Sequence, residues 1–511
     1  MPLASRRSLV ALVLGLLVAA AAVAGCAASS SGGGGSDPAA LVPAGAPLYA
    51  EAVFGGDAQE QADAQAALAK ILRTADPRGE LVKAFDRGNV DFARDVEPWL
   101  GDRVGAAALS LGARGDKVVV AASRDDAAAR AALARLAPKG SPRTYRGVAY
   151  RVDQARGTAA AVVGGFVVLG SENGLKAAID ASKGSSLAES DSLKQARANV
   201  RRQRSAFLYV DVAGFLREAL GATGGGASQL APFAQPVALA LPKTIAAALD
   251  AEPGMLRLDS AAFGNGGGFA SGASGADALA ALPADAWLGA GVGELGPTVN
   301  GLLDRVSAQG GIAGVGLQAL LGQAQQRLGL DIRRDLLAWM GDAGIYVAGT
   351  TAADRRAALV IASKDPAASQ RAVRALEPLA RRSGTVTPLT VAGVDAGFAL
   401  RRGRSDDEIL VASGGNRFVV AVGRRALTEA VAPGGARLGD AAAFRAAAGK
   451  LGSGVRPSFF LDVQRLSGMA PGKGAGHGGQ LREYLGAFGA VIGGARRDGD
   501  VTRGEAVATL R

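Results

Sequence analysis

The chain has 511 residues and a formal net charge of +11 at pH 7; 49% of its residues are hydrophobic and 20% are charged. This balance is typical of a folded globular protein and excludes wholesale disorder. The arginines form scattered pairs such as Arg201-Arg202 and Arg424-Arg425, with no basic stripe interleaved with aromatic residues, so we expect no nucleic-acid partner. A single cysteine precludes an intrachain disulfide, and together with a single histidine it argues against a zinc site or a Cys-His nucleophile.

The first 25 residues have the pattern of a signal peptide. Arg6 and Arg7 form a positive segment, residues 9–22 form an apolar segment, and small residues lead up to Cys26. Residues 23–26, Val-Ala-Gly-Cys, resemble the bacterial lipoprotein box, in which the cysteine thiol receives a diacylglyceryl group. The resemblance implies cleavage before Cys26, attachment of acyl chains such as palmitate at Cys26, and a location on the extracytoplasmic side of the cell membrane.

Residues 26–40 comprise the lipidated cysteine and a Gly/Ser-rich tether, AASSSGGGGSDPAA. A flexible tether of this length spans on the order of 20 Å. No later stretch has the ~18 to 20 continuous apolar residues that a transmembrane helix needs. We therefore expect the membrane to be a partner through the N-terminal lipid anchor alone.

An internal duplication organises the rest of the chain. The segment DFARDVEPWLGD at 91–102 recurs as DIRRDLLAWMGD at 331–342, an offset of 240 residues, and FVVLG from Phe166 aligns with FVVAV from Phe418. The repeat predicts two tandem homologous domains and a glycine-rich linker. Their boundaries are 41–263 for the first domain, 264–279 for the linker and 280–511 for the second domain.

Short apolar or alternating segments predict strands, and apolar residues at helical spacing predict helices. In chain order the first copy is expected to contain strands over 48–53, 104–110, 118–122, 148–152, 158–163, 166–169 and 207–212, and helices over 127–136 and 175–181. Several strands follow one another too closely for a crossover helix, so antiparallel hairpins are expected, one of them turning at residues 497–500. Each copy is therefore predicted to be an α+β domain with helices packed on one face of a mainly antiparallel sheet.

The repeated Asp-x-x-Arg-Asp-x-x-x-Trp-x-Gly-Asp element is the first candidate site. Its central carboxylates, Asp95 and Asp335, each follow an arginine and are candidate acids or bases. The structural alternative is a short helix that buries the tryptophan and ends at Gly101 or Gly341 as a left-handed C-cap.

Two further patterns have both a functional and a structural interpretation. Asp211 and Asp462 end apolar strands, where each is a candidate general acid of raised pKa or the N-cap of a following helix. Residues 291–296 fit the dinucleotide pattern GxGxxG, but no parallel βαβ unit surrounds them. We therefore expect no nucleotide, no other cofactor and no metal.

Glycine-rich loops occupy matching places in the two copies, at 221–226 and 471–479. His477, in the second loop, has no counterpart in the first and is interpreted as a solvated residue. The loops themselves are candidates for gating a groove, or are surface insertions.

The segments VPAGAPLYAEAV at 42–53, DVEPWLGDRVG at 95–105 and VVVAAS at 118–123 resemble a family of bacterial lipoproteins, domain of unknown function 3352. The resemblance covers most of the mature chain, here as two tandem copies. It implies the cell-envelope location, and it carries no activity, ligand or catalytic residue.

These observations together predict an exported, membrane-anchored lipoprotein that binds or interacts in the cell envelope and is not an enzyme. An envelope polymer, a lipid or a protein is a possible partner, and a domain interface is the default place for a ligand. Two alternatives stay open: a carboxylate-dependent hydrolase acting on envelope polymers, and a purely structural or assembly lipoprotein.

Overall fold

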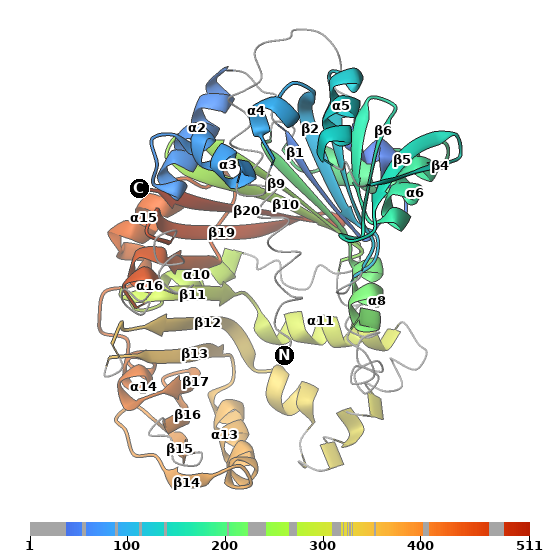
Figure 1. Ribbon diagram of the computed structural model, residues 1–511. Helices are drawn as coiled ribbons and strands as arrows, with labels where there is room; N and C mark the ends of the chain where they lie inside the picture. Colours follow the sequence, from blue (N-terminus) through green and yellow to red (C-terminus); the bar gives the residue numbers. More distant parts are fainter. Residues whose placement is uncertain are drawn as a thin grey trace. The chain divides into compact units, whose positions relative to one another are not determined.

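A computed structural model describes most of the chain (Figure 1). The described residues are 37–511 except 54–57, 87–89, 112–114, 137–139, 202–203, 223–241, 265–272, 309–317, 320, 324, 327–328, 330, 352–353, 402–407 and 470–484. Cys26, the tether up to residue 36, residues 265–272 of the glycine-rich linker and His477 with its loop lie outside the described residues, as do residues 223–226 of the matching loop.

The described residues form two compact units. Unit 1 holds the described residues up to Gly264 together with Leu510, and unit 2 holds the others from Ala273 onward. Each unit is an antiparallel sheet with helices against it, so the predicted α+β class and the mainly antiparallel sheet are confirmed. No helix in the described part of the chain is long and apolar enough to cross a membrane.

The described part of unit 1 has one antiparallel sheet in the order β4-β5-β6-β7-β3-β2-β1-β8-β9-β10. Its strands are β1 (Leu48–Val53), β2 (Leu100–Ala108), β3 (Lys117–Ser123), β4 (Ser141–Tyr145), β5 (Val148–Asp153), β6 (Thr158–Val163), β7 (Phe166–Gly170), β8 (Ala206–Asp211), β9 (Thr244–Glu252) and β10 (Met255–Phe263). Its helices are η1 (Pro38–Leu41), α2 (Ala58–Leu72), α3 (Pro77–Asp86), α4 (Phe92–Asp95), α5 (Asp126–Leu136), α6 (Glu172–Ala181), η2 (Leu187–Glu189), α7 (Asp191–Ala198) and α8 (Val212–Ala222).

Unit 2 has the same strand order, β14-β15-β16-β17-β13-β12-β11-β18-β19-β20, among its described residues. Its strands are β11 (Ala286–Val292), β12 (Met340–Ala348), β13 (Arg356–Ser363), β14 (Thr385–Pro388), β15 (Ala396–Arg401), β16 (Glu408–Gly414), β17 (Arg417–Val422), β18 (Phe459–Asp462), β19 (Phe488–Asp498) and β20 (Val501–Leu510). Its helices are α10 (Ala273–Ala280), α11 (Leu295–Ala308), the π-helix η4 (Ile332–Leu337), α13 (Pro366–Arg381), α14 (Arg424–Val431), η5 (Leu438–Asp440), α15 (Ala442–Ala448) and α16 (Val463–Met469).

The helices cover both faces of the unit 2 sheet, whereas the sequence predicted helices on one face. Ile361 of β13 lies in the core that α13 covers. Its neighbour Val360 points to the opposite face and lines a cavity beside α14. The physical reason is that β13 is apolar at consecutive positions, Ala357 to Ala362, so both of its faces favour burial.

The turns that join neighbouring strands use residues that tolerate positive φ. In the β6–β7 turn Gly164 and Gly165 have φ of 55° and 82°, and in the β16–β17 turn Gly415 and Asn416 have φ of 55° and 59°. Positive φ at both central residues is the condition of a two-residue type I′ hairpin. The predicted turn at 497–500 is also present, between the end of β19 and the start of β20.

Candidate functional site

The structure places Asp95 in an ion-paired, buried position. Its side chain is 1% exposed and accepts hydrogen bonds from Arg94 Nη2 at 2.8 Å and Arg135 Nε at 2.9 Å. The hydrogen bond from Arg94, assisted by Arg135, lowers the pKa of Asp95 to about 2. Asp95 is therefore ionised at neutral pH and is poorly suited to act as a general acid.

The matching residue of unit 2 has a similar environment. Asp335 accepts from Arg334 Nε at 2.8 Å and from the Asp331 main-chain N–H at 2.8 Å, and these interactions lower its pKa. In both units the tryptophan of the element donates its indole N–H to a main-chain oxygen: Trp99 to Asp95 at 2.7 Å and Trp339 to Asp335 at 2.9 Å. The element therefore anchors a buried tryptophan to a short helix, as the structural alternative predicted.

The predicted C-caps at Gly101 and Gly341 are wrong. Both glycines lie inside strands, β2 and β12, and neither has positive φ. A Cβ on Gly101 would lie 2.9 Å from the carbonyl oxygen of Ala122, and one on Gly341 would lie 3.1 Å from that of Ala362. Each glycine thus allows a close approach to the neighbouring strand at an irregularity in register.

Asp462 is an N-cap. Its Oδ1 accepts the main-chain N–H groups of Gln464 and Arg465, at 3.1 and 3.2 Å, at the start of α16. Asp211 likewise ends β8 directly before α8, and its main-chain N–H bonds to Pro47 O at 3.0 Å.

The GxGxxG pattern does not form a dinucleotide loop. Gly291 belongs to β11, which pairs antiparallel with both β12 and β18. A Cβ on Gly291 would lie 2.0 Å from Gly275 O, and one on Gly296 would lie 2.0 Å from Leu337 O. These glycines serve close packing, and the parallel βαβ unit that nucleotide binding requires is not formed by β11.

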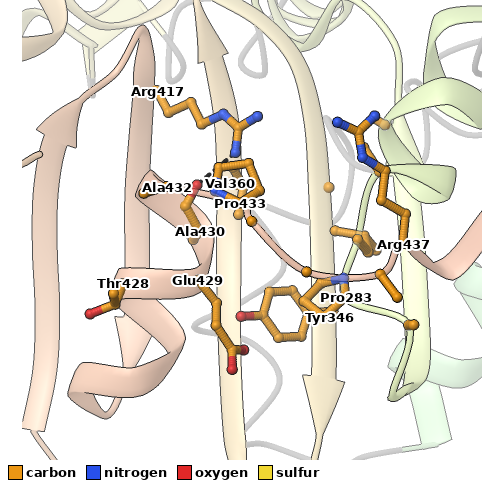
Figure 2. Close-up of a pocket in the computed structure, with 18 of the residues that line it drawn as sticks. Pro283, Tyr346, Val360, Arg417, Thr428, Glu429, Ala430, Ala432, Pro433 and Arg437 are labelled. Atoms are coloured by element: carbon orange, nitrogen blue, oxygen red, sulfur yellow. Dashed lines mark hydrogen bonds between the residues drawn. The ribbon is translucent and has the colours of Figure 1, made fainter.

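A cavity of about 600 Å³ lies within unit 2 (Figure 2). Its floor is formed by β12, β13 and the start of β17. One wall is α14 with the segment that follows it, and the other wall is the end of α10 with residues 281–285. The two walls are joined by main-chain hydrogen bonds from Ala284 N to Ala436 O at 3.0 Å and from Leu438 N to Leu282 O at 2.7 Å.

Two arginines lie at one end of this cavity. Figure 2 shows the guanidinium groups of Arg417 and Arg437 at the same end, away from Glu429 and Tyr346. Arg417 is half-buried and donates from Nη1 to Ala430 O at 2.7 Å, and Arg437 is exposed. Partial burial, and then the positive charge of Arg437, lower the pKa of Arg417.

The other end of the cavity carries an ion-pair network in which Arg356 and Arg425 share carboxylates. Arg356 is 3% exposed and pairs with Asp285, with Asp354 at 3.3 Å and with Glu429 at 2.8 Å. Tyr346, 1% exposed, packs beside this network, and burial raises the pKa of its hydroxyl. The cavity therefore has a cationic end, apolar and main-chain walls, and an opposite end whose charges are paired.

The sequence patterns did not indicate this cavity. Its two walls come from residues 277–285 and 428–437, which are far apart in the chain. Within the described residues, no group of three His, Cys, Asp or Glu side chains is placed to hold a metal ion.

Comparison with known proteins gives one clear assignment. No curated protein matches the chain. Solved structures that match include crystal forms I and III of TP0453, which are 10% and 13% identical with TM-scores of 0.25 and 0.23; each match covers 44% of this chain and 78% or 79% of that chain. These scores establish no common fold. The family model for proteins of unknown function DUF3352 matches residues 8–469, most of the chain, and the chain therefore belongs to this family.

Proposed function

We propose that the protein is an exported, lipid-anchored binding protein of the cell envelope and that the cavity of unit 2 is its ligand site. The leader pattern and the Val-Ala-Gly-Cys segment ending at Cys26 support the anchor and the extracytoplasmic location. The observation that carries the binding role is the cavity itself, whose volume of about 600 Å³ lies in the usual range of ligand pockets.

We also propose that the two units descend from one duplicated domain. The common strand order, the matching tryptophan-to-aspartate hydrogen bonds and the matching bridges Pro43–Ser186 and Pro283–Arg437 support this origin. On this view the two copies share a framework, and the cavity of unit 2 reflects side chains in which the copies differ.

A hydrolase role for Asp95 or Asp335 receives less support than binding. Guanidinium groups hold both carboxylates in the ionised form, and each belongs to the packing of its tryptophan. The other candidate pair is Asp211 and Asp462, and the carboxylate of Asp462 already accepts main-chain N–H groups as an N-cap.

The test is native mass spectrometry of the full chain purified from the membranes of an exporting host. Ala432 is exposed and lines the cavity, so Ala432→Trp is expected to occupy part of the cavity and obstruct a ligand at little cost to the fold. Ala443→Trp, at an exposed position of α15 that does not line the cavity, is the matched control. We expect a bound small molecule in the wild type and the control, and its loss from Ala432→Trp.

Two results would contradict the proposal. A ligand that stays bound in Ala432→Trp would place the binding site elsewhere. If the wild type and both variants give ligand-free masses even after envelope extracts are added back at high concentration, a structural or assembly role is favoured.

A further inference from the structure

We propose that Arg417 and Arg437 bind the anionic group of an amphiphile, a phosphate or carboxylate joined to an apolar chain that lies along the cavity. This inference rests on the proposed function, that the cavity binds a ligand, and adds the chemical class of that ligand.

The charge distribution favours an anion at this end of the cavity. Among the described residues, neither Arg417 nor Arg437 has a carboxylate within ion-pair distance. The two like charges share one end of the cavity, where Arg417 is partly withdrawn from water. A bound anion would offset the repulsion between the two cations and accept charge-assisted hydrogen bonds from their guanidinium groups.

The carboxylates that line the cavity are engaged elsewhere. Asp285 and Glu429 pair with Arg356, and Asp277 pairs with Arg456. The fourth, Asp342, accepts the main-chain N–H of Glu294 at 2.8 Å. Of the four arginines that line the cavity, Arg356 and Arg425 are thus paired with carboxylates, whereas Arg417 and Arg437 have no such pair among the described residues.

The fold does not require arginine at either position. Strand pairing places Arg417 opposite Ala362, as it places Phe166 opposite Ala122 in unit 1. Phe166 is 4% exposed, so the same place in the framework accepts a buried apolar side chain. Arg437 forms the main-chain bridge to Pro283 that Ser186 forms to Pro43. The positions that Phe166 and Ser186 occupy in unit 1 are therefore both occupied by arginines in unit 2, at the same end of the cavity.

The rest of the lining favours a ligand with an apolar part. Beyond the arginines, the cavity is bordered by Leu282, Pro283, Val360 and Ala430, and by a run of small residues from Ala432 to Ala436. A cavity of about 600 Å³ is much larger than a free phosphate ion, and apolar walls gain by covering an apolar chain. An amphiphilic anion satisfies both the charged end and the walls.

The experiment is isothermal titration calorimetry of the mature chain, residues 26–511 with Cys26→Ser, which retains every residue that the structure describes. The probes are octyl phosphate below its micellar concentration, octanol, and inorganic phosphate. The variants are Arg417→Phe and Arg437→Ser, which introduce the residues that unit 1 carries at these places. Arg374→Ser is the charge-matched control, because Arg374 is exposed on α13 and does not line the cavity.

We expect octyl phosphate to bind with 1:1 stoichiometry, and about tenfold or more weaker in each cavity variant, the loss typical of a charge-assisted hydrogen bond. The control is expected to bind like the starting protein. If octanol binds as tightly as octyl phosphate, the inference that the ligand carries an anionic group is overturned. If inorganic phosphate binds as tightly, the inference that the ligand carries an apolar chain is overturned. Unchanged affinity in both variants would overturn the role of the arginines.

The failure of this inference can be distinguished from failure of the proposed function. If Ala432→Trp loses a natural ligand in native mass spectrometry while octyl phosphate does not bind, the cavity is a binding site for another chemical class. Thermal unfolding of each variant, followed by circular dichroism, shows that the lost affinity comes from a folded protein.

Discussion

Asp95 illustrates how a buried carboxylate can stabilise a fold without catalytic use. It receives hydrogen bonds from Arg94 and Arg135, which come from α4 and α5, and its main-chain oxygen receives the indole N–H of Trp99. The residue therefore joins two helices and the tryptophan that follows. Because its folded pKa of about 2 is below the usual ~3.9, its charged form stabilises the native state.

We predict that Asp95→Asn lowers the urea midpoint of unfolding at pH 7 and that the difference from wild type shrinks on acidification. The contribution of a carboxylate with a depressed pKa is complete above its unfolded pKa, near 4, and is lost as the pH falls toward the folded value of about 2. Urea unfolding at pH 7, 4, 3 and 2.5 measures this.

Asp304→Asn serves as the control for this series, because Asp304 is 66% exposed and its ion pair with Arg333 is solvated. It is expected to leave the midpoint nearly unchanged at every pH. A difference between Asp95→Asn and wild type that grows as the pH falls would contradict the assigned role.

At the scale of elements, the short helix η1 is fixed to unit 1 by a buried charge network. Arg197 of α7 donates to Asp37, the N-cap of η1, at 2.6 and 3.1 Å, and to the buried Glu51 of β1 at 2.6 Å. Burial by itself would raise the pKa of Asp37, but hydrogen bonding and the charge of Arg197 outweigh it and lower the pKa. The network joins the beginning of the described chain to the sheet.

We predict that Arg197→Ala lowers the free energy of unfolding by about 3 kcal/mol or more, because Glu51 would lose its closest cation while remaining buried. Arg381→Ala, which removes an exposed pair with Glu377 on α13, is expected to change it by less than about 0.5 kcal/mol. Chemical denaturation of both variants measures the two values. Equal changes in the free energy of unfolding for the two variants would contradict the role of Arg197 in balancing the buried charge of Glu51.

Element boundaries were predictable for strands with many buried residues. The expected strands at 48–53 and 158–163 coincide with β1 and β6. In β6 every second residue is buried, and in β1 four of the six residues are buried. Strand β4 was missed because its residues Ser141–Pro142–Arg143–Thr144 are exposed and show no apolar alternation. Local patterns report burial, so they identify core strands better than exposed ones.

The candidate site could not be predicted because it depends on pairing between distant segments. Sequence similarity aligns Phe418 with Phe166, whereas strand pairing makes Arg417 the equivalent of Phe166. The turns show the same equivalence, because Phe166 directly follows the turn residues Gly164 and Gly165, and Arg417 directly follows Gly415 and Asn416. Only the pairing reveals that an arginine occupies the place of a buried phenylalanine.

At the scale of the whole molecule, the two units combine one framework with different interiors. The strand order is the same in both, yet the end of the unit 2 cavity has two arginines where unit 1 has Phe166 and Ser186. The framework thus accepts either apolar or charged side chains at these places. If the proposed function holds, the copy with Phe166 keeps an apolar residue there while the copy with the arginines provides the ligand site.

The lipid anchor would determine where this binding takes place, and Cys26→Ser tests it. Only the thiol can carry the diacylglyceryl group, so we predict that the variant incorporates no labelled palmitate and leaves the membrane fraction of an exporting host. Burial of acyl chains contributes about 0.8 kcal/mol per CH₂, so removing two or more chains removes the whole of a stable attachment. Ser29→Ala, a change in the same tether that leaves the thiol intact, is expected to retain both label and membrane association. If Cys26→Ser still incorporated palmitate, the lipid would be attached at another residue. If the variant lost the label and stayed in the membrane fraction, another contact would hold the protein at the membrane. The location of the cavity would then depend on that contact and not on the lipid anchor.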